Sequence, residues 1–298
     1  MNDIRLTRRA ALSALTLPWL VTGCSTPLPL GEKPITDASA AARLRDSAEA
    51  HGLSAYRTIA DINIAYDGQW RPFVNGIQPE IVDAGYRGPS QERLLPAAGV
   101  VAQAYRGPQG TKQVFWQRAR NAADAQGDVA VWLNGVRSED AARQRASALV
   151  AEAYGLFLLG PLWLVGRELP TQTAGRATVD GRDCDVVDVW LAPGLGRSVL
   201  DRLSLYLDRT DQVMRRVRFT LEGFSSSQGA VAEVDTFEHE RRFGVLWPMR
   251  SYERIAHPFT LPAHDWRITG LDVNRGYSVD ALRGPTFTGS AATPAEPV

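Results

Sequence analysis

The side chains that could perform acid–base or metal chemistry are few and widely spaced. The four histidines are His51, His239, His257 and His264, and no two are four residues apart, the spacing at which a helix offers two imidazoles to one zinc ion. Asp235 precedes His239 by four residues in a strand-like segment, so the two side chains share a face and could form an acid–base pair. The alternative is that both are solvated strand residues. No nucleophile accompanies them, and we expect the chain not to be an enzyme.

Two further motifs invite a chemical interpretation. Asp183, Asp185 and Asp188 could suggest a calcium site, but the first two flank Cys184 at strand spacing, which favours a solvated strand face. The stretch Gly194-Leu-Gly196-Arg197 lacks the strand–helix context of a phosphate-binding loop and is expected to be an ordinary loop. No Gly-x-Ser-x-Gly elbow is present. We therefore expect neither a metal nor a cofactor.

The charges of the chain balance, with 33 basic and 33 acidic residues. A protein without net charge gives no reason to expect nucleic-acid binding. The only concentration of basic residues comprises Arg215, Arg216, Arg218, Arg241 and Arg242. These arginines could face lipid head groups, or they could form an ordinary outer face.

The N-terminal segment has the features of an export signal. A short basic region is followed by residues 10–22, which carry no charge and are too few to span a bilayer as a helix. The segment ends in Val21-Thr22-Gly23-Cys24, which resembles the bacterial lipobox. The resemblance implies that the thiol of Cys24 is acylated and that the bond before it is cut. The alternative is an ordinary signal peptide.

These features predict the organisation of the chain. Residues 1–23 are expected to be a lipoprotein signal peptide, residues 24–36 a proline-rich tether, residues 37–285 a single domain and residues 286–298 a disordered tail. Export by the general route or by the twin-arginine route stays open. Ser25 stands where inner-membrane retention signals usually place Asp, so the resemblance implies a lipid anchor in the outer membrane, facing the periplasm.

Helical spacing occurs in two places. A first helix is expected from Asp37 to a stop at His51-Gly52. A second has Ser138 as its expected N-cap, and its apolar residues from Ala142 to Phe157 fall on one face. This helix runs into Leu156–Val165, the most apolar stretch after the signal segment.

Most of the remaining chain has strand-like alternation. Ile62, Ile64 and Tyr66 alternate with other residues, and so do Leu203, Leu205 and Leu207. A long antiparallel sheet with one apolar face must be covered, and the few helices are the only available cover. We expect an α+β, mainly antiparallel β fold: a strongly curved sheet or open half-barrel of about ten or eleven strands with helices packed in its concavity.

Two stretches resemble the LolA/LolB-type lipoprotein-localisation proteins. Leu205–Phe219 has a strand, a turn at Asp208-Arg-Thr-Asp211 and a second strand, and Asp235–Pro248 has a strand followed by Phe243-Gly-Val-Leu-Trp-Pro248. In that family an unclosed barrel covered by helices holds an acyl chain. The resemblance implies a lipid or lipoprotein acyl chain as ligand, bound in a hydrophobic cavity without catalysis. A second hypothesis is an envelope sensor that uses the same fold to bind a protein partner.

The apolar stretch Leu156–Val165 and the helix before it are the expected ligand site. Exposed, this stretch would contact a membrane or a partner, and inside a half-barrel it would line an acyl cavity or simply fill the core. The residues expected to line the cavity are Tyr154, Phe157, Leu158, Trp163 and Leu164.

Overall fold

The structure is a computed structural model that describes residues 28–119, 127–196, 198–224 and 228–286. The expected signal peptide and Cys24 lie outside the described residues, as does the expected tail from residue 287 onwards. Residues 28–36 form neither helix nor strand. They are nevertheless bound to the domain, because Trp190 Nε1 donates to the Leu30 carbonyl at 2.8 Å and Arg202 Nη1 donates to the Pro29 carbonyl at 2.8 Å.

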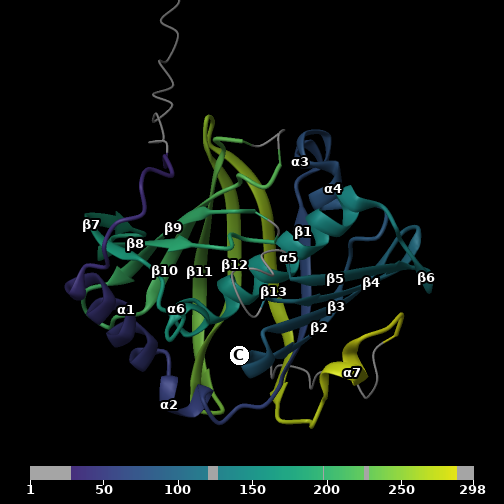
Figure 1. The fold of residues 1–298 in the computed structure, drawn as a ribbon, viewed down its shortest axis with the longest axis horizontal. Coiled ribbons are helices and arrows are strands. Elements are labelled where there is room, and N and C mark those ends of the chain that lie inside the picture. The colour runs from purple at the N-terminus through teal and green to yellow at the C-terminus, as the bar shows by residue number, and fades with distance from the viewer. Residues whose placement is uncertain (1–27, 120–126, 197, 225–227, 287–298) are drawn as a thin grey trace, which may run out of the picture.

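The described residues form one antiparallel sheet of thirteen strands in the order β6-β5-β4-β3-β2-β1-β13-β12-β11-β10-β9-β8-β7. The strands are β1 Ile62–Trp70, β2 Ser90–Leu95, β3 Val100–Gly107, β4 Gly110–Gln117, β5 Asp128–Leu133, β6 Val136–Arg137, β7 Thr171–Val179, β8 Arg182–Leu191, β9 Asp201–Asp208, β10 Met214–Thr220, β11 Val231–Arg242, β12 Val245–His257 and β13 Leu261–Val273. The sheet is open and curved (Figure 1), so its two edges are β6 and β7. The expected fold class is confirmed, with thirteen strands in place of ten or eleven.

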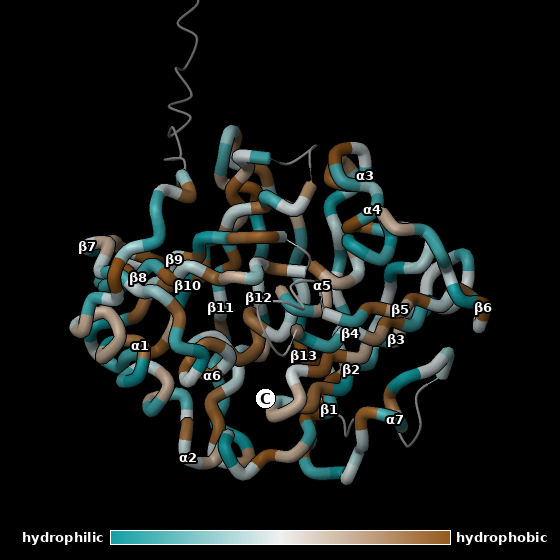
Figure 2. Tube along the Cα trace, in the orientation of Figure 1, coloured by the Kyte–Doolittle hydropathy of each residue, from teal (hydrophilic) through white to brown (hydrophobic). Residues whose placement is uncertain are grey.

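The strand pattern explains how the sheet acquires two different faces. Ile62, Ile64 and Tyr66 on β1 point into the main core, and Leu203, Leu205 and Leu207 on β9 do the same. Hydrophobic and hydrophilic residues therefore alternate along the strands (Figure 2). The concave face contributes to one large core cluster, while smaller clusters form on the outer face.

Helices supply the cover of the concave face. The helical elements are α1 Ala38–Ala50, α2 Leu53–Tyr56, α3 Pro72–Ile77, α4 Pro79–Val82, the 3₁₀ turn η1 Pro96–Ala98, α5 Ala141–Leu159, α6 Pro161–Leu164 and α7 Val279–Leu282. Because α5 and α6 connect β6 to β7, they cross the hollow of the sheet from one edge to the other (Figure 1). Among the described residues, no helix is long and apolar enough to cross a membrane.

The helix ends show how local sequence starts and stops these elements. Asp37 caps α1 through its carboxylate, and α1 ends at His51-Gly52 as expected. The expected cap of the central helix, Ser138, is wrong by two positions. Asp140 is the N-cap, since its carboxylate accepts from the backbone N–H groups of Ala142 and Arg143 at 2.9 and 3.2 Å.

A buried carboxylate joins the first strand to the C-terminal segment. Asp61 is fully buried and accepts hydrogen bonds from the backbone N–H groups of Arg275, Gly276 and Tyr277 at 2.9, 2.7 and 3.2 Å. Those bonds fix the chain between β13 and α7, whose Leu282 covers a core cluster on the outer face of the sheet. The charge-assisted bonds should therefore stabilise both elements.

Replacing Asp61 by Ala removes the buried acceptor of three part-buried backbone N–H groups. We expect the free energy of unfolding to fall by about 2 kcal/mol, because a hydrogen bond to a charged group contributes about 1.5–3 kcal/mol. Denaturant unfolding measures the change, with the exposed Asp46→Ala as the matched control. Equal stability of the two variants would contradict the role given to Asp61.

Candidate functional site

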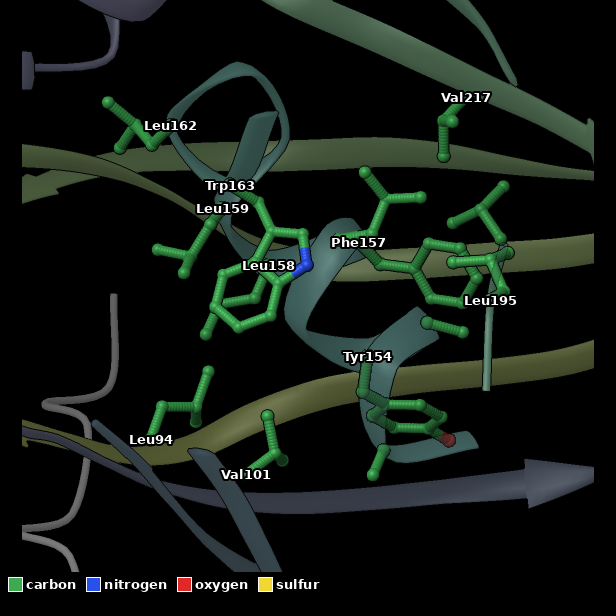
Figure 3. Close-up of a cluster of buried hydrophobic side chains, with 14 of the residues drawn as sticks. Leu94, Val101, Tyr154, Phe157, Leu158, Leu159, Leu162, Trp163, Leu195 and Val217 are labelled. Atoms are coloured by element: carbon green, nitrogen blue, oxygen red, sulfur yellow. The ribbon is translucent and has the colours of Figure 1, made fainter. Parts of the chain in front are cut away.

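The apolar segment is buried under the sheet. The leucine, phenylalanine and tryptophan side chains from Leu156 to Leu164 belong to the core, and each of them is between 0% and 5% exposed. Figure 3 shows these side chains facing one another and residues of the sheet such as Val101 and Val217. The alternative of an exposed membrane-binding or partner-binding patch at this segment is therefore wrong. The physical reason is that the concave face of the sheet has no other long apolar cover.

A small apolar cavity of about 50 Å³ lies between α5 and the sheet. Its walls come from α3, α4, α5, strand β1 and the strands β10 to β13. The lining residues are Trp70, Val74, Gln78, Ile81, Leu149, Val150, Ala153, Tyr154, Phe157, Phe219, Leu221, Ala232, Glu253, Ile255 and Ala263. Of the five residues expected to line an acyl cavity, Tyr154 and Phe157 do so here.

The other three expected residues pack in the core away from this cavity. Leu158 and Leu164 belong to the main cluster. Trp163 packs against Gly155, where an added Cβ would lie 3.1 Å from the indole, and Arg118 lies 4.4 Å above its ring. These three residues line neither of the two cavities described here.

A second, more polar cavity of about 220 Å³ adjoins the first one, and both are lined by Trp70 and Tyr154. Three stacked aromatic rings on the neighbouring strands β1 and β13 line this cavity. His264 lies 4.3 Å from Trp70 and 4.6 Å from Trp266, with ring planes 10° and 19° apart. The stack forms because Trp70 on β1 pairs with His264 on β13 in the register of the sheet. Nδ1 of His264 lies 3.1 Å from the hydroxyl of Tyr154.

Arg87, in the loop between α4 and β2, provides the positive charge of this cavity. Its Nη2 donates to the Ile81 carbonyl at 3.0 Å, and its Nε donates to the Val82 carbonyl at 3.3 Å. The guanidinium carbon lies 4.5 Å from the ring centre of Tyr105 and 5.9 Å from that of Tyr154. These cation–π contacts partly replace the water that the charge has lost.

Burial shifts the pKa values of the acidic and basic groups around Arg87. It raises the pKa of Glu92 to about 8, although Gln103 and Arg87 oppose the shift. Burial likewise raises the pKa of Glu253, on the wall of the apolar cavity, to about 7. The pKa of His264 is held well below its ordinary value by burial and by Arg87. Near neutral pH the histidine is therefore uncharged, and the charge of Arg87 dominates the site.

Sequence reasoning missed Arg87, Tyr105 and Glu253, and it treated His264 only as a candidate zinc ligand. Each of them is an isolated polar or aromatic residue in an otherwise ordinary segment. The signal that could have found part of the site is the pair of tryptophans in strand-like segments, Trp70 and Trp266. Both rings stack on His264, however, only because β1 and β13 pair in the sheet.

The polar candidates of the sequence do not form a catalytic group. Asp235 is buried and forms ion pairs with Arg216 and with Arg254, the latter at 3.0 Å. His239 instead lies 3.5 Å from Arg215 through Nδ1 and Nη1. The expectation that Asp235 is a solvated strand residue is therefore wrong, and no contact joins it to His239 in the part of the chain that the structure describes.

The three aspartates that could have suggested calcium are also separated from one another. Asp185 is buried against α1, where it pairs with Arg43, whereas Asp188 is buried on the other side of the strand and pairs with Arg202. Only Asp183 is solvent-exposed, so the expected solvated face is wrong for the other two. Within the described ranges, no group of three or more His, Cys, Asp and Glu residues is arranged to hold a metal ion. Cys184, which lies between Asp183 and Asp185 in the sequence, is a buried free thiol.

The concentration of arginines and the Gly194-Leu-Gly196 stretch also make contacts within the fold. Arg216 and Arg218 lie within 3.6 and 3.3 Å of Glu233, so this part of the basic concentration is neutralised. Gly194 and Gly196 lie in the loop between β8 and β9, as expected. The Gly196 N–H donates to Glu152 of α5 at 2.9 Å, and an added Cβ would lie 2.6 Å from the Leu149 nitrogen, so the loop packs on the helix.

Comparison with known proteins finds solved structures with a similar fold. No family model matches the sequence, and no curated protein matches it. A DUF1329 family protein from Desulfovibrio piger ATCC 29098 is similar in structure, with 12% identity over 81% of this chain and 96% of that chain and a TM-score of 0.50. A LolA superfamily protein from Nitrosomonas europaea gives 12% identity, 82% and 96% coverage and a TM-score of 0.50. The chain therefore has a LolA-like fold, as the sequence resemblance implied.

The buried acids predict how stability depends on pH. Glu92, Glu152 and Glu253 have pKa values raised by burial to about 8, 7 and 7 from 4.5. Their contribution to stability is full below pH 4.5 and is lost as the pH rises through those values. His51 and His239, with pKa values lowered by burial to about 4 from 6.5, act in the opposite sense, but only below pH 6.5.

Between pH 6.5 and 8 the free energy of unfolding should therefore decrease with pH, whereas above that range Lys112, whose pKa burial lowers to about 8 from 10.5, acts in the opposite sense. Glu92→Gln should flatten the decrease, because a single group changes the slope by at most about 1.4 kcal/mol per pH unit. Denaturant unfolding between pH 6.5 and 8 measures the slope, and the exposed Glu49→Gln should leave it unchanged. A Glu92→Gln slope equal to that of the unmodified protein would show that Glu92 is already ionised in the folded state.

Proposed function

We propose that this chain is a membrane-anchored lipoprotein of the bacterial envelope that binds a lipid or lipoprotein acyl chain, without catalysis. The observation that carries the proposal is the apolar cavity between α5 and the sheet, lined by residues such as Val150, Phe157, Phe219 and Ile255. A hydrocarbon chain is bound by breadth of apolar surface rather than by a few polar donors, and this cavity offers such a surface.

The position of exposed apolar residues supports an approach from a membrane. Phe73 and Ile77 of α3 are 39% and 44% exposed, and Phe259 in the turn between β12 and β13 is 72% exposed. In Figure 1, α3, the tip of the β12–β13 hairpin and the start of the described chain all lie at the upper end of the molecule. The apolar cavity is lined by Val74 of α3 and Ile255 of β12, from the same end.

The proposed anchor would hold that end close to the bilayer. The Pro29 carbonyl is bound by Arg202, so only the residues between Cys24 and Pro29 separate the lipidated position from the domain. Five residues span at most about 18 Å when fully extended. A lipid leaving the membrane would therefore travel only a short distance to the apolar cavity.

The cavity must enlarge to hold an acyl chain. Its volume of about 50 Å³ is less than the volume that two water molecules take up in the liquid, about 30 Å³ each. The cover that can move most easily is α3 and α4, because these helices have only six and four residues. Their buried contacts involve a small cluster of Val74, Val82 and Ala263.

Filling the cavity should block binding. Ala153 lies on α5 and lines the cavity, so Ala153→Leu places three more carbon atoms in the space an acyl chain would enter. We expect uptake of a fluorescent fatty-acid probe to weaken at least about tenfold, which corresponds to about 1.4 kcal/mol. Titration of probe fluorescence measures the affinity.

The matched control is Ala130→Leu, which adds the same atoms to the outer cluster and should retain probe binding. If folded Ala153→Leu protein binds the probe normally, the ligand occupies another site. If the unmodified protein takes up no probe and carries no lipid after purification, the proposed function is rejected.

The anchor has its own test. Cys24→Ser removes the thiol that the lipobox resemblance assigns to acylation, so the protein should move from the membrane fraction to the soluble envelope fraction. Incorporation of labelled palmitate should be lost at the same time. Cys184→Ser, at the buried free thiol, is the control and should keep both the label and the membrane location. Palmitate labelling that survives Cys24→Ser would place the lipid elsewhere.

A further inference from the structure

Arg87 is a partly buried cation without a counterion among the described residues. Two of its donors are used by the Ile81 and Val82 carbonyls, and no carboxylate forms an ion pair with it in the described part of the chain. A guanidinium that has lost water and has no anionic partner is costly, and cation–π contacts with Tyr105 and Trp70 offset only part of that cost. The remaining donor groups of Arg87 are therefore available to an anion from outside the chain.

Two neutral donors in the same cavity also lack acceptors. The hydroxyl of Tyr105 and Nε1 of Trp70 are buried and have no hydrogen-bond partner among the described residues, and both side chains line the cavity of Arg87. Tyr105 as a whole is only 4% exposed. Buried donors are satisfied in nearly all native structures, so these two unsatisfied donors beside Arg87 in one cavity indicate a missing acceptor.

The acidic residues nearby do not supply that acceptor. Asp83 is engaged by Lys112 at 2.6 Å and by Arg143 at 3.8 Å. Glu92 accepts a hydrogen bond from Gln103 at 2.8 Å, and its pKa of about 8 keeps it mainly protonated at neutral pH. Asp67 is at the exposed rim of the cavity, where its carboxylate accepts from the next backbone N–H at 2.9 Å.

The polar cavity is continuous in its lining with the apolar one. Trp70 and Tyr154 contribute to the walls of both cavities, so a molecule with a charged end and a hydrocarbon end could occupy them together. The geometry points to Arg87, Tyr105 and Trp70 as the binding site for the anionic head group, a carboxylate or phosphate monoester, of the amphiphile whose chain enters the apolar cavity. This inference rests on the function proposed above and adds selectivity for the charge of the ligand.

The chemistry of the site favours an anion over other head groups. A guanidinium presents a planar fork of donors that matches a carboxylate or phosphate, and donor-only partners such as the Trp70 indole add to that preference. A quaternary ammonium group, which aromatic rings could otherwise hold, would be repelled because Arg87 already occupies the faces of Tyr105 and Tyr154. A neutral head group would leave the charge of Arg87 uncompensated.

The experiment compares ligands that share one chain and differ in the head group. Oleate, oleoyl lysophosphatidate and oleyl alcohol displace a fluorescent acyl probe from the full-length protein, and inorganic phosphate is tested alone. We expect the two anionic ligands to bind at least about tenfold more tightly than oleyl alcohol. Arg87→Gln should remove this difference while leaving oleyl alcohol binding unchanged, and Tyr105→Phe should reduce it.

The matched control is Arg106→Gln. Arg106 follows Tyr105 on β3 and is exposed, so the preference for anionic ligands should survive its loss. Oleyl alcohol binding by Arg87→Gln, together with an unchanged thermal unfolding midpoint, shows that the variant is folded. Arg87→Lys separates charge from geometry, because it keeps the charge without the planar fork and should retain only part of the preference.

The outcomes separate the two proposals. If all three oleoyl ligands bind equally and Arg87→Gln changes nothing, the head-group site is overturned while the acyl-binding function stands. If no oleoyl ligand binds, the acyl-binding function itself fails. If inorganic phosphate binds as tightly as oleoyl lysophosphatidate and Arg87→Gln abolishes both, the site takes free anions, and the amphiphile is overturned as its ligand.

Discussion

The crossing of α5 and α6 through the hollow of the sheet is the constraint on which the other features depend. An open antiparallel sheet of this length exposes one broad apolar face, and burial of that face is the main favourable term available to the fold. Since α5 and α6 connect the two edge strands, the most apolar segment of the domain crosses that face. The segment Leu156–Leu164 is buried as a result, and the sheet keeps its curvature around it.

Polar contacts fix the helix in this position. Glu152 of α5 is buried and accepts from the Gly196 N–H, which ties the β8–β9 loop to the helix. The same carboxylate lies 3.9 Å from Arg167, just beyond α6. Burial raises the pKa of Glu152 to about 7. A buried carboxylate with few partners is costly, so its hydrogen bond to the loop specifies one position for the helix rather than adding much stability.

Packing is tight on one face of α5 and incomplete on another. Trp163 fills the space beside Gly155, and the surrounding leucines leave no large gap. Around Tyr154 and Phe157, by contrast, the helix, the short helices α3 and α4 and the strands leave two adjoining cavities. The difference arises because α3 and α4 cover the sheet with few apolar residues. Part of the outer face is instead covered by ion pairs such as Arg216–Asp235 and Arg254–Asp235.

The sequence by itself determined the fold class and the ends of α1, but it left open whether the apolar segment is buried or exposed. Those features depend on local alternation, helix capping and the amount of apolar surface, all of which can be recognised within short stretches of the sequence. The sequence placed Tyr154 and Phe157 in the site for the same reason, but it also placed Leu158, Trp163 and Leu164 there, because helical spacing does not say which part of a buried face meets a gap.

Only the tertiary structure decided the polar half of the site. His264 stacks on Trp70 because β13 pairs with β1, two strands separated by almost the whole domain. Arg87 reaches the same rings from a loop. Solvated faces were expected at Asp185, Asp188 and Asp235, whereas all three are buried and paired with arginines of other elements. Strand register and the contacts between elements are set by the pairing of the whole sheet, so no local pattern in the sequence reveals them.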